Sequence, residues 1–174
     1  ITVFQGQAVA DGKNDVGLRV GYYIPNDYSS YFPLQSEQTE EYIHLDNVTI
    51  DTYIRRKINS GLDVGFDLGF AGVLDKSDQN TILNMFPISI YMLKKITKLY
   101  GLNLYAGGGL NYWYMETKTG SMEGRSGYNM KLDFSYQLFV AELVYSTTYK
   151  QNETVTDVGG WGFKVGAAFN FVYK

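Results

Sequence analysis

The chain has 174 residues, a formal net charge of −3, no Cys and an aromatic content of 16%. Its length predicts one domain, its slight negative charge offers no basic surface for nucleic acid, and the lack of Cys excludes disulfides and thiolate metal sites. No run of about 18 apolar residues is present, so no transmembrane helix is predicted. Abundant Tyr, Phe and Gly (16, 10 and 19 residues) favour β structure.

Eight segments alternate between apolar and polar residues, which is the pattern of a strand with one apolar face. In chain order they are "NDVGLRVGYYIP" (14–25), "NVTIDTYIRR" (47–56), "LDVGFDLGFAG" (62–72), "MFPISIYML" (85–93), "GLNLYAGGGLNYWY" (101–114), "YNMKLDFSYQL" (128–138), "AELVYSTTY" (141–149) and "WGFKVGAAFNFVY" (161–173). The seventh segment is the least regular of the eight.

The connections between these segments alternate in length. Short turns are expected at 57–61, at 94–98 and near Gln137–Phe139, and longer polar loops at 26–41, 75–80, 116–127 and 150–159. Alternating short turns and long loops predict an up-and-down meander. We therefore expect an N-terminal segment at 1–13 and one barrel domain at 14–174. We also expect the chain to be the mature or trimmed form of an exported protein.

The alternation leaves open which face meets the surroundings. A lipocalin-like barrel or a β-sandwich would bury the apolar faces, whereas a membrane barrel would turn them to lipid. The apolar faces carry more bulky side chains than the interior of an eight-stranded barrel can hold. The opposite faces are rich in Gly, such as Gly17, Gly65, Gly107 and Gly166, and small residues suit a crowded interior.

Two further features favour the membrane alternative. The apolar faces hold no charged residue over about ten positions per strand, the length of a tilted membrane strand. Aromatic residues gather near strand ends, as in the aromatic girdles of lipid-facing barrels. These residues are Tyr22, Tyr112, Tyr114, Tyr128, Trp161 and Tyr173. The sequence thus predicts an all-β fold, an eight-stranded antiparallel up-and-down transmembrane β-barrel.

This plan resembles the small outer-membrane barrels of Gram-negative bacteria, the class of the OmpA transmembrane domain, OmpX and OmpW. The ending "KVGAAFNF" is similar to the C-terminal assembly signal of that class, with Lys164, Gly166, Phe169 and Phe171 at the matching places. The resemblance implies location in the bacterial outer membrane and contact with the barrel-assembly machinery.

The polar faces carry nine charged residues that would point into the lumen. They are Arg19, Asp51, Arg55, Asp63, Asp67, Lys131, Asp133, Glu142 and Lys164. Near-balance between acids and bases favours paired charges in a confined lumen, because an unpaired buried charge is costly. We expect a salt-bridged plug, with a selectivity-lined pore or a catalytic carboxylate pair as the alternatives.

A turn centred near Asn59 would place Arg55 opposite Asp63 and Asp51 opposite Asp67. The second pair consists of like charges and needs a cation. Arg19 lies on the same face of the neighbouring strand, and its planar guanidinium can bridge two carboxylates. The sequence therefore predicts an Arg19–Asp51–Asp67 cluster that blocks ion flow at mid-height.

Other candidate sites have weaker patterns. The single His, His44, could form a triad with Asp46 and a Ser of the preceding loop (Ser29, Ser30 or Ser36), but it lacks the clustered motif that the enzymatic small barrels imply. The oxygen-rich stretches 77–80 and 151–157 lack calcium-loop spacing. The three Gly at 107–109 lie within a predicted strand and open no helix, so they are not a phosphate-binding loop. No catalytic residue, metal or cofactor is assigned.

We expect a non-enzymatic barrel with a structural or narrow-passage role, which includes OmpW-like, porin-like passage of a small apolar solute. The alternative is a surface interaction or adhesion protein that acts through its long loops, above all the Tyr-rich loop 26–41. The expected partners are outer-membrane lipid and lipopolysaccharide, the assembly machinery, and a small apolar solute or surface partner. The barrel is expected to be a monomer of the cell envelope.

Overall fold

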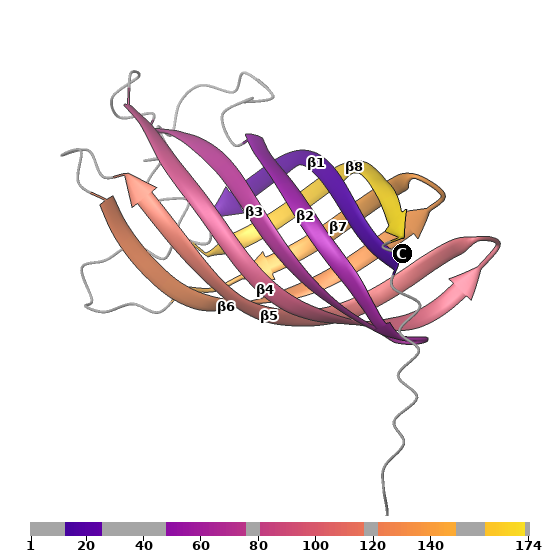
Figure 1. Ribbon diagram of the computed structural model, residues 1–174. Helices are drawn as coiled ribbons and strands as arrows, with labels where there is room; N and C mark the ends of the chain where they lie inside the picture. Colours follow the sequence, from indigo (N-terminus) through magenta and orange to yellow (C-terminus); the bar gives the residue numbers. More distant parts are fainter. Residues whose placement is uncertain (1–12, 26–47, 76–80, 117–121, 149–158, 173–174) are drawn as a thin grey trace, which may run out of the picture.

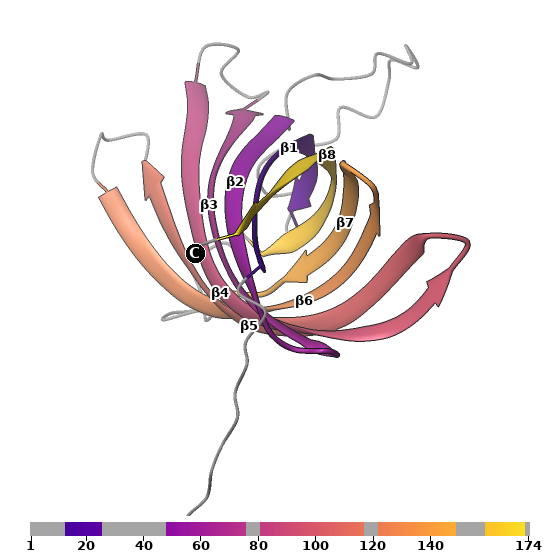
Figure 2. The ribbon, with the colours of Figure 1, turned by 45° about the vertical axis from the view of Figure 1, so that its right-hand side comes forward.

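The computed structural model describes residues 13–25, 48–75, 81–116, 122–148 and 159–172, which form eight antiparallel strands (Figure 1). The strands are β1 (Lys13–Pro25), β2 (Val48–Asn59), β3 (Leu62–Asp75), β4 (Thr81–Leu99), β5 (Leu102–Glu116), β6 (Met122–Tyr136), β7 (Phe139–Ser146) and β8 (Gly160–Val172). Each strand pairs with its neighbours in sequence, and β1 also pairs with β8, which closes the barrel (Figures 1 and 2). The predicted eight-stranded up-and-down barrel is confirmed.

In the described part of the chain, no helix has both the length and the apolar composition needed to cross a membrane.

The outward-facing side chains of the barrel are apolar and remain exposed. Leu110 is 72% exposed and Ile90 61%, whereas Asp67 on the inward face is 4% exposed. In β3 the apolar residues Phe66 and Leu68 are both exposed. So large an apolar exterior is unfavourable in water, where each Å² of exposed apolar surface costs about 25 cal/mol. In contact with the hydrocarbon of a lipid bilayer, the same surface carries no such cost. The apolar faces of the strands point outward, as a lipid-facing barrel requires.

Aromatic residues line the exterior near the ends of the strands that the long loops connect. Tyr112, Tyr114, Tyr128 and Trp161 are exposed there. Tyr112 and Tyr114 lie with their ring centroids 4.8 Å apart, and Tyr145 packs against Trp161 at the same separation. Aromatic rings with one polar edge suit the boundary between hydrocarbon and water. Of the other predicted girdle residues, Tyr22 is half-buried and Tyr173 lies outside the described residues.

Inward-facing Gly residues make room for large side chains on neighbouring strands. Gly17 pairs with Tyr53 across β1 and β2, and a Cβ atom at Gly17 would lie 2.3 Å from Cε1 of that ring. Gly65 pairs with Tyr91 across β3 and β4, and a Cβ atom there would lie 2.3 Å from Cζ of the ring. Both rings are buried. The Gly-rich inner face is therefore a packing requirement of a narrow, filled lumen.

Replacing Gly65 with Ala is expected to destabilise the barrel by about 1–3 kcal/mol, because the new methyl group overlaps the buried Tyr91 ring. Urea unfolding of the protein in lipid vesicles measures this change. Gly61→Ala is the matched control, since no atom lies within 4 Å of a Cβ at that position. Equal stability of the two variants would contradict this account of the inner glycines.

Three short turns connect β2–β3, β4–β5 and β6–β7, and we call the end of the barrel that carries them the short-turn end. The turn expected at 94–98 is wrong, because β4 continues to Leu99 and the chain reverses at Tyr100–Gly101. These two residues have φ values of 49° and 87°, as a tight type I′ hairpin requires. Figure 2 shows this hairpin projecting beyond its neighbours. The loop expected at 116–127 is shorter than predicted, because β6 begins at Met122.

The predicted register of the β2–β3 hairpin is also wrong. Asp51 pairs with Gly69, and Lys57 pairs with Asp63, so the strands are offset from the predicted pairing. The cause is at the turn, where the Gly61 backbone N–H donates to the Asn59 side-chain oxygen at 2.9 Å and an irregularity follows Lys57. Asn side chains favour turns by accepting a hydrogen bond from the backbone N–H two residues ahead. In this hairpin the bond from Gly61 to Asn59 places the centre of the turn one residue later than predicted.

Candidate functional site

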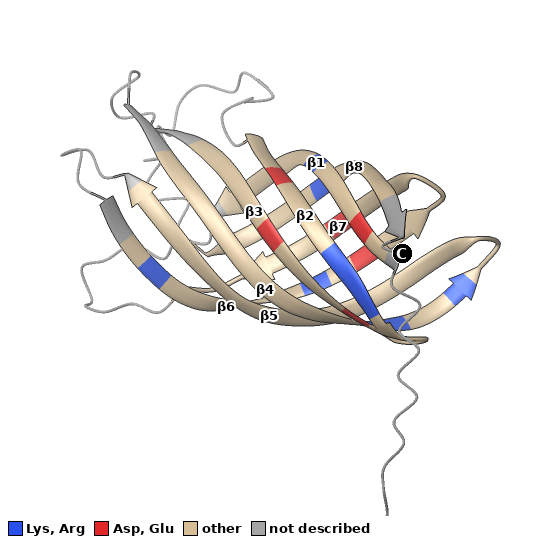
Figure 3. Cartoon of the chain, in the orientation of Figure 1, with Lys and Arg blue, Asp and Glu red and all other residues tan. Residues whose placement is uncertain are grey.

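The nine predicted lumen residues all point inward and are buried. They come from six strands: Arg19 from β1, Asp51 and Arg55 from β2, Asp63 and Asp67 from β3, Lys131 and Asp133 from β6, Glu142 from β7 and Lys164 from β8. The period of two along each strand places them on the inner face, since successive side chains alternate between the faces of a sheet. Figure 3 shows that these charges gather on the middle of the barrel and toward the short-turn end.

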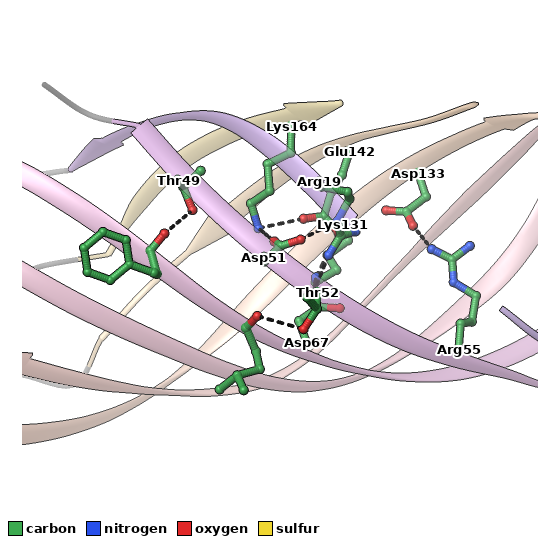
Figure 4. Close-up of polar contacts among 12 residues, drawn as sticks. Arg19, Thr49, Asp51, Thr52, Arg55, Asp67, Lys131, Asp133, Glu142 and Lys164 are labelled. Carbon is green, nitrogen blue, oxygen red and sulfur yellow. Dashed lines mark hydrogen bonds and ion pairs between the residues drawn. The ribbon is translucent and has the colours of Figure 1, made fainter. Parts of the chain in front are cut away.

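Arg19 lies at the centre of the site and contacts carboxylates from three other strands (Figure 4). Its Nε donates to Asp51 Oδ1 at 2.7 Å, and its Nη1 donates to Glu142 Oε2 at 2.6 Å. Its Nη2 lies 3.0 Å from Asp67 Oδ2. The guanidinium is 1% exposed. A planar group with five N–H donors can serve three acceptors at once, which a Lys ammonium at this position could not do with the same geometry.

Two Lys residues complete this cluster. Lys131 Nζ contacts Asp67 and lies 2.9 Å from Glu142 Oε2. Lys164 Nζ contacts Asp51 and lies 3.1 Å from Glu142 Oε1. We name the set of three acids and three bases the central charge network, and it consists of Arg19, Asp51, Asp67, Lys131, Glu142 and Lys164. Its formal charges cancel, and its members come from β1, β2, β3, β6, β7 and β8, so the network crosses the lumen.

The structure brings Arg19 together with Asp51 and Asp67, as the sequence analysis expects, although the two acids are not opposite each other. The place of Glu142 in the same cluster is not visible in the sequence. It lies 123 residues from Arg19 in the sequence, and only the closure of the barrel brings its strand, β7, within two strands of β1. The alternating pattern indicates only that Glu142 points inward.

A second ion pair lies toward the short-turn end. Arg55 contacts Asp133 on β6, so the Arg55–Asp63 pair expected from the hairpin is wrong. The shifted register places Gly65 opposite Arg55, and this leaves the guanidinium free to extend across the lumen.

Aromatic rings connect the two layers of charge. The Arg19 guanidinium lies 4.5 Å from the centroid of the Tyr53 ring, and the Arg55 guanidinium lies 5.4 Å from the same centroid. Lys131 Nζ lies 4.1 Å above the Tyr91 ring. Such cation–π contacts stabilise desolvated cations. The alternation of residues along β2 and β4 puts both Tyr residues on the polar face, but it indicates no role for them, because the pattern is the same whether or not a cation lies above the ring.

The carboxylates of Asp51, Asp67 and Glu142 offer oxygens within 4.8 Å of one another, which is a spacing that a metal ion could use. Each of them already contacts at least two cationic side chains of the network. A divalent cation would have to displace those ammonium and guanidinium groups. The arrangement therefore fits internal ion pairing better than metal binding.

The remaining candidates divide between the described residues and the rest of the chain. His44, Asp46, Ser29, Ser30, Ser36, the loop 26–41 and the stretches 77–80 and 151–157 lie outside the described residues. The glycines at 107–109 lie within β5. Of the predicted assembly signal, Lys164 belongs to the central charge network, Gly166 faces β1 and Phe169 is 54% exposed on the outer face. Phe171 belongs to β8, near the end of that strand.

No protein-family model and no curated protein matches this chain. Solved structures are similar in fold. The outer membrane protein OprG from Pseudomonas aeruginosa is 12% identical, with a TM-score of 0.62 over 94% of this chain and 98% of that chain. A major outer membrane protein from Thermus thermophilus is 12% identical, with a TM-score of 0.59 over 92% of this chain and 99% of that chain.

Neisserial surface protein A is 14% identical to this chain, with a TM-score of 0.58 over 93% of this chain and 98% of that chain. At such identities the similarity establishes the fold alone. The chain has the fold of the small eight-stranded outer-membrane barrels, which confirms the predicted fold class.

Proposed function

We propose that this protein is a non-enzymatic barrel of the bacterial outer membrane whose lumen is closed by the central charge network. Its role is then structural, or limited to narrow passage. The observation that carries this proposal is the meeting of six oppositely charged, buried side chains from six strands across the lumen. A structural role needs a rigid, closed wall, and this network ties opposite sides of the barrel together.

The network opposes ion flow for an energetic reason. An ion that passes mid-height must separate buried groups that now satisfy one another, and leaving a buried charge unpaired costs about 3–5 kcal/mol. Passage of a small apolar solute along the full lumen has less support, because the same charged groups would lie in its path and would lose their partners to an apolar surface.

In planar bilayers, the purified protein is expected to show no steady single-channel conductance, in contrast to an open porin reconstituted in the same way. Liposome swelling in a small neutral sugar should likewise match that of protein-free vesicles, because the lumen is filled at mid-height. Large, steady conductance steps from the folded barrel would overturn the proposal of a closed lumen. Uptake of a small apolar dye by these liposomes would instead favour narrow passage.

We also propose that the assembly machinery reads the outward face of β8. Phe169→Ala is expected to reduce the amount of barrel inserted in cells several-fold, while refolding into detergent in vitro stays unchanged. Phe163→Ala is the matched control, because Phe163 lies on the same face of the same strand and is 56% exposed but lies outside the signal. Heat-modifiable migration on gels quantifies folded barrel in both settings.

Equal loss for both Phe variants in cells, or equal loss in cells and in vitro, would favour a general packing role over recognition. Gly166 is unsuitable for this test. A Cβ atom there would lie 1.9 Å from the Leu18 carbonyl oxygen, so its replacement is expected to impair folding in any setting.

A further inference from the structure

A polar chamber of about 210 Å³ lies inside the barrel at the short-turn end. Its lining includes the turn residues Ser60 and Gln137. One water molecule occupies about 30 Å³ of liquid, so the chamber has room for a small organic molecule. In outer-membrane barrels the short turns face the periplasm, which is where the chamber would meet its solutes.

The chamber is closed on the side of the central charge network. Tyr53, Arg55 and Tyr105 line this side, and the Arg55 guanidinium lies 5.4 Å from the centroids of both rings. Tyr53 also contacts Arg19, so it separates the chamber from the network. Asp133 already neutralises Arg55. This side of the chamber is therefore an aromatic wall whose one cationic group is already paired with a carboxylate.

Asp63 has an unusual position in the chamber. It is 7% exposed, lines the cavity, and forms no hydrogen bond or ion pair within 4.0 Å among the described residues. A buried carboxylate without a partner is costly, so its oxygens require water or a cationic group in the cavity. Asp15, the second carboxylate of the lining, already has an interaction partner.

Two ammonium groups face the same chamber. Lys57 pairs with Asp63 in the β2–β3 register, and Lys95 on β4 pairs with Tyr105, which also lines the chamber. Within the described ranges, neither Lys lies within 4.0 Å of a carboxylate. The chamber thus combines one buried anion with two cations that do not contact it.

This charge arrangement selects among ligand classes. A bare cation would be held by Asp63 but repelled by Lys57 and Lys95. A simple anion would be held by the two Lys residues but repelled by Asp63. A molecule that carries both charges satisfies all three groups at once, because opposite charges at close range attract.

We propose that this chamber binds a small zwitterion in which a short chain joins an ammonium group to an acidic group. The ammonium donates hydrogen bonds to the Asp63 carboxylate. The acidic group accepts hydrogen bonds from Lys57 and Lys95. A phosphate suits these two Lys residues better than a carboxylate, because its charge of nearly −2 matches two ammonium groups.

The test is calorimetric titration of the full chain, refolded in detergent micelles, with O-phosphoethanolamine. We expect saturable binding, and at least tenfold weaker binding of ethanolamine and of inorganic phosphate, each of which carries only one of the two groups. Asp63→Asn, which keeps the side-chain shape, is expected to weaken O-phosphoethanolamine binding at least tenfold. Lys95→Ala is expected to weaken it several-fold, because one of two phosphate contacts is lost.

Lys98→Ala is the matched control, since Lys98 lies on the same strand, is exposed and does not line the chamber. Circular dichroism and heat-modifiable migration establish that each variant is folded. Absence of binding to the parent protein, unchanged binding to Asp63→Asn, or equally tight binding of ethanolamine would overturn the proposal.

An ammonium group joined to a phosphate occurs in a free phosphomonoester and also in the headgroup of phosphatidylethanolamine, where the phosphodiester carries one fewer negative charge, and nanodiscs distinguish the two sources. The titration is repeated in phosphatidylcholine nanodiscs with and without phosphatidylethanolamine. Weaker apparent binding of the free probe when phosphatidylethanolamine is present would identify the headgroup as the occupant. Unchanged binding would identify a free periplasmic solute.

Discussion

Replacing Arg19 with Ala is expected to destabilise the folded barrel by about 3–5 kcal/mol, the range observed when one partner of a buried ion pair is removed. Its guanidinium contacts Asp51, Asp67 and Glu142, so its loss leaves three buried carboxylates with only Lys131 and Lys164 to neutralise them. Urea unfolding in lipid vesicles, followed by Trp fluorescence, measures the free energy of unfolding.

Two further variants make this prediction specific. Arg19→Lys keeps the positive charge but cannot reach three carboxylates in one plane, so an intermediate loss is expected. Arg56→Ala removes an exposed Arg on the adjacent strand and is expected to change stability by no more than about 0.5 kcal/mol. If Arg19→Ala is no more destabilising than Arg56→Ala, the central charge network contributes nothing to stability and its proposed structural role fails.

Replacing Leu68 with Arg is expected to cost about 2–4 kcal/mol, which is the penalty for a charged side chain on the lipid face near the bilayer midplane. Leu68 is 49% exposed on the outer face of β3, level with the middle of the barrel. Unfolding in vesicles of defined thickness measures the change.

Ile58→Arg is the depth control for this prediction. Ile58 is 46% exposed, much like Leu68, but it lies next to the Ser60–Gly61 turn, at the end of the barrel where we expect the membrane boundary. A cost of only about 0–1 kcal/mol is expected there. Equal costs at the two positions would show that the exterior does not contact a bilayer in the proposed orientation.

The sequence is sufficient to predict which face of each strand points outward and which points into the lumen. In β3, the alternation of Phe66 and Leu68 with Asp67 determines which side chains face lipid and which face the lumen, because neighbouring side chains on a strand point to opposite faces. The abundance of Gly on the polar face, as at Gly65, then indicates a narrow interior. These features depend on residues one or two positions apart in the chain, so they can be predicted from the sequence alone.

The ends of the strands and the register between them cannot be predicted in the same way from the alternation of residues. The Asn59 side chain sets the β2–β3 turn through one hydrogen bond to Gly61, and the β4–β5 turn depends on positive φ at Tyr100 and Gly101. In the β2–β3 hairpin, the partner of Asp51 is Gly69, two residues from the predicted partner Asp67. A register shift of two residues keeps every side chain on the same face of the sheet. The predicted inward positions are therefore correct although the predicted pairing is wrong. Turn geometry determines register, and several turns are compatible with the same short sequence.

Only the closed barrel determined which charges meet. Glu142 reaches Arg19 because β1 pairs with β8 and β8 pairs with β7, so closure places β7 two strands from β1. Arg55 on β2 contacts Asp133 on β6, the strand on the opposite side of the closed barrel. The sequence by itself determined that these side chains point inward and that their charges nearly balance. Their partners depend on the curvature and stagger of the whole sheet, since contacts across a lumen join residues that no local pattern relates.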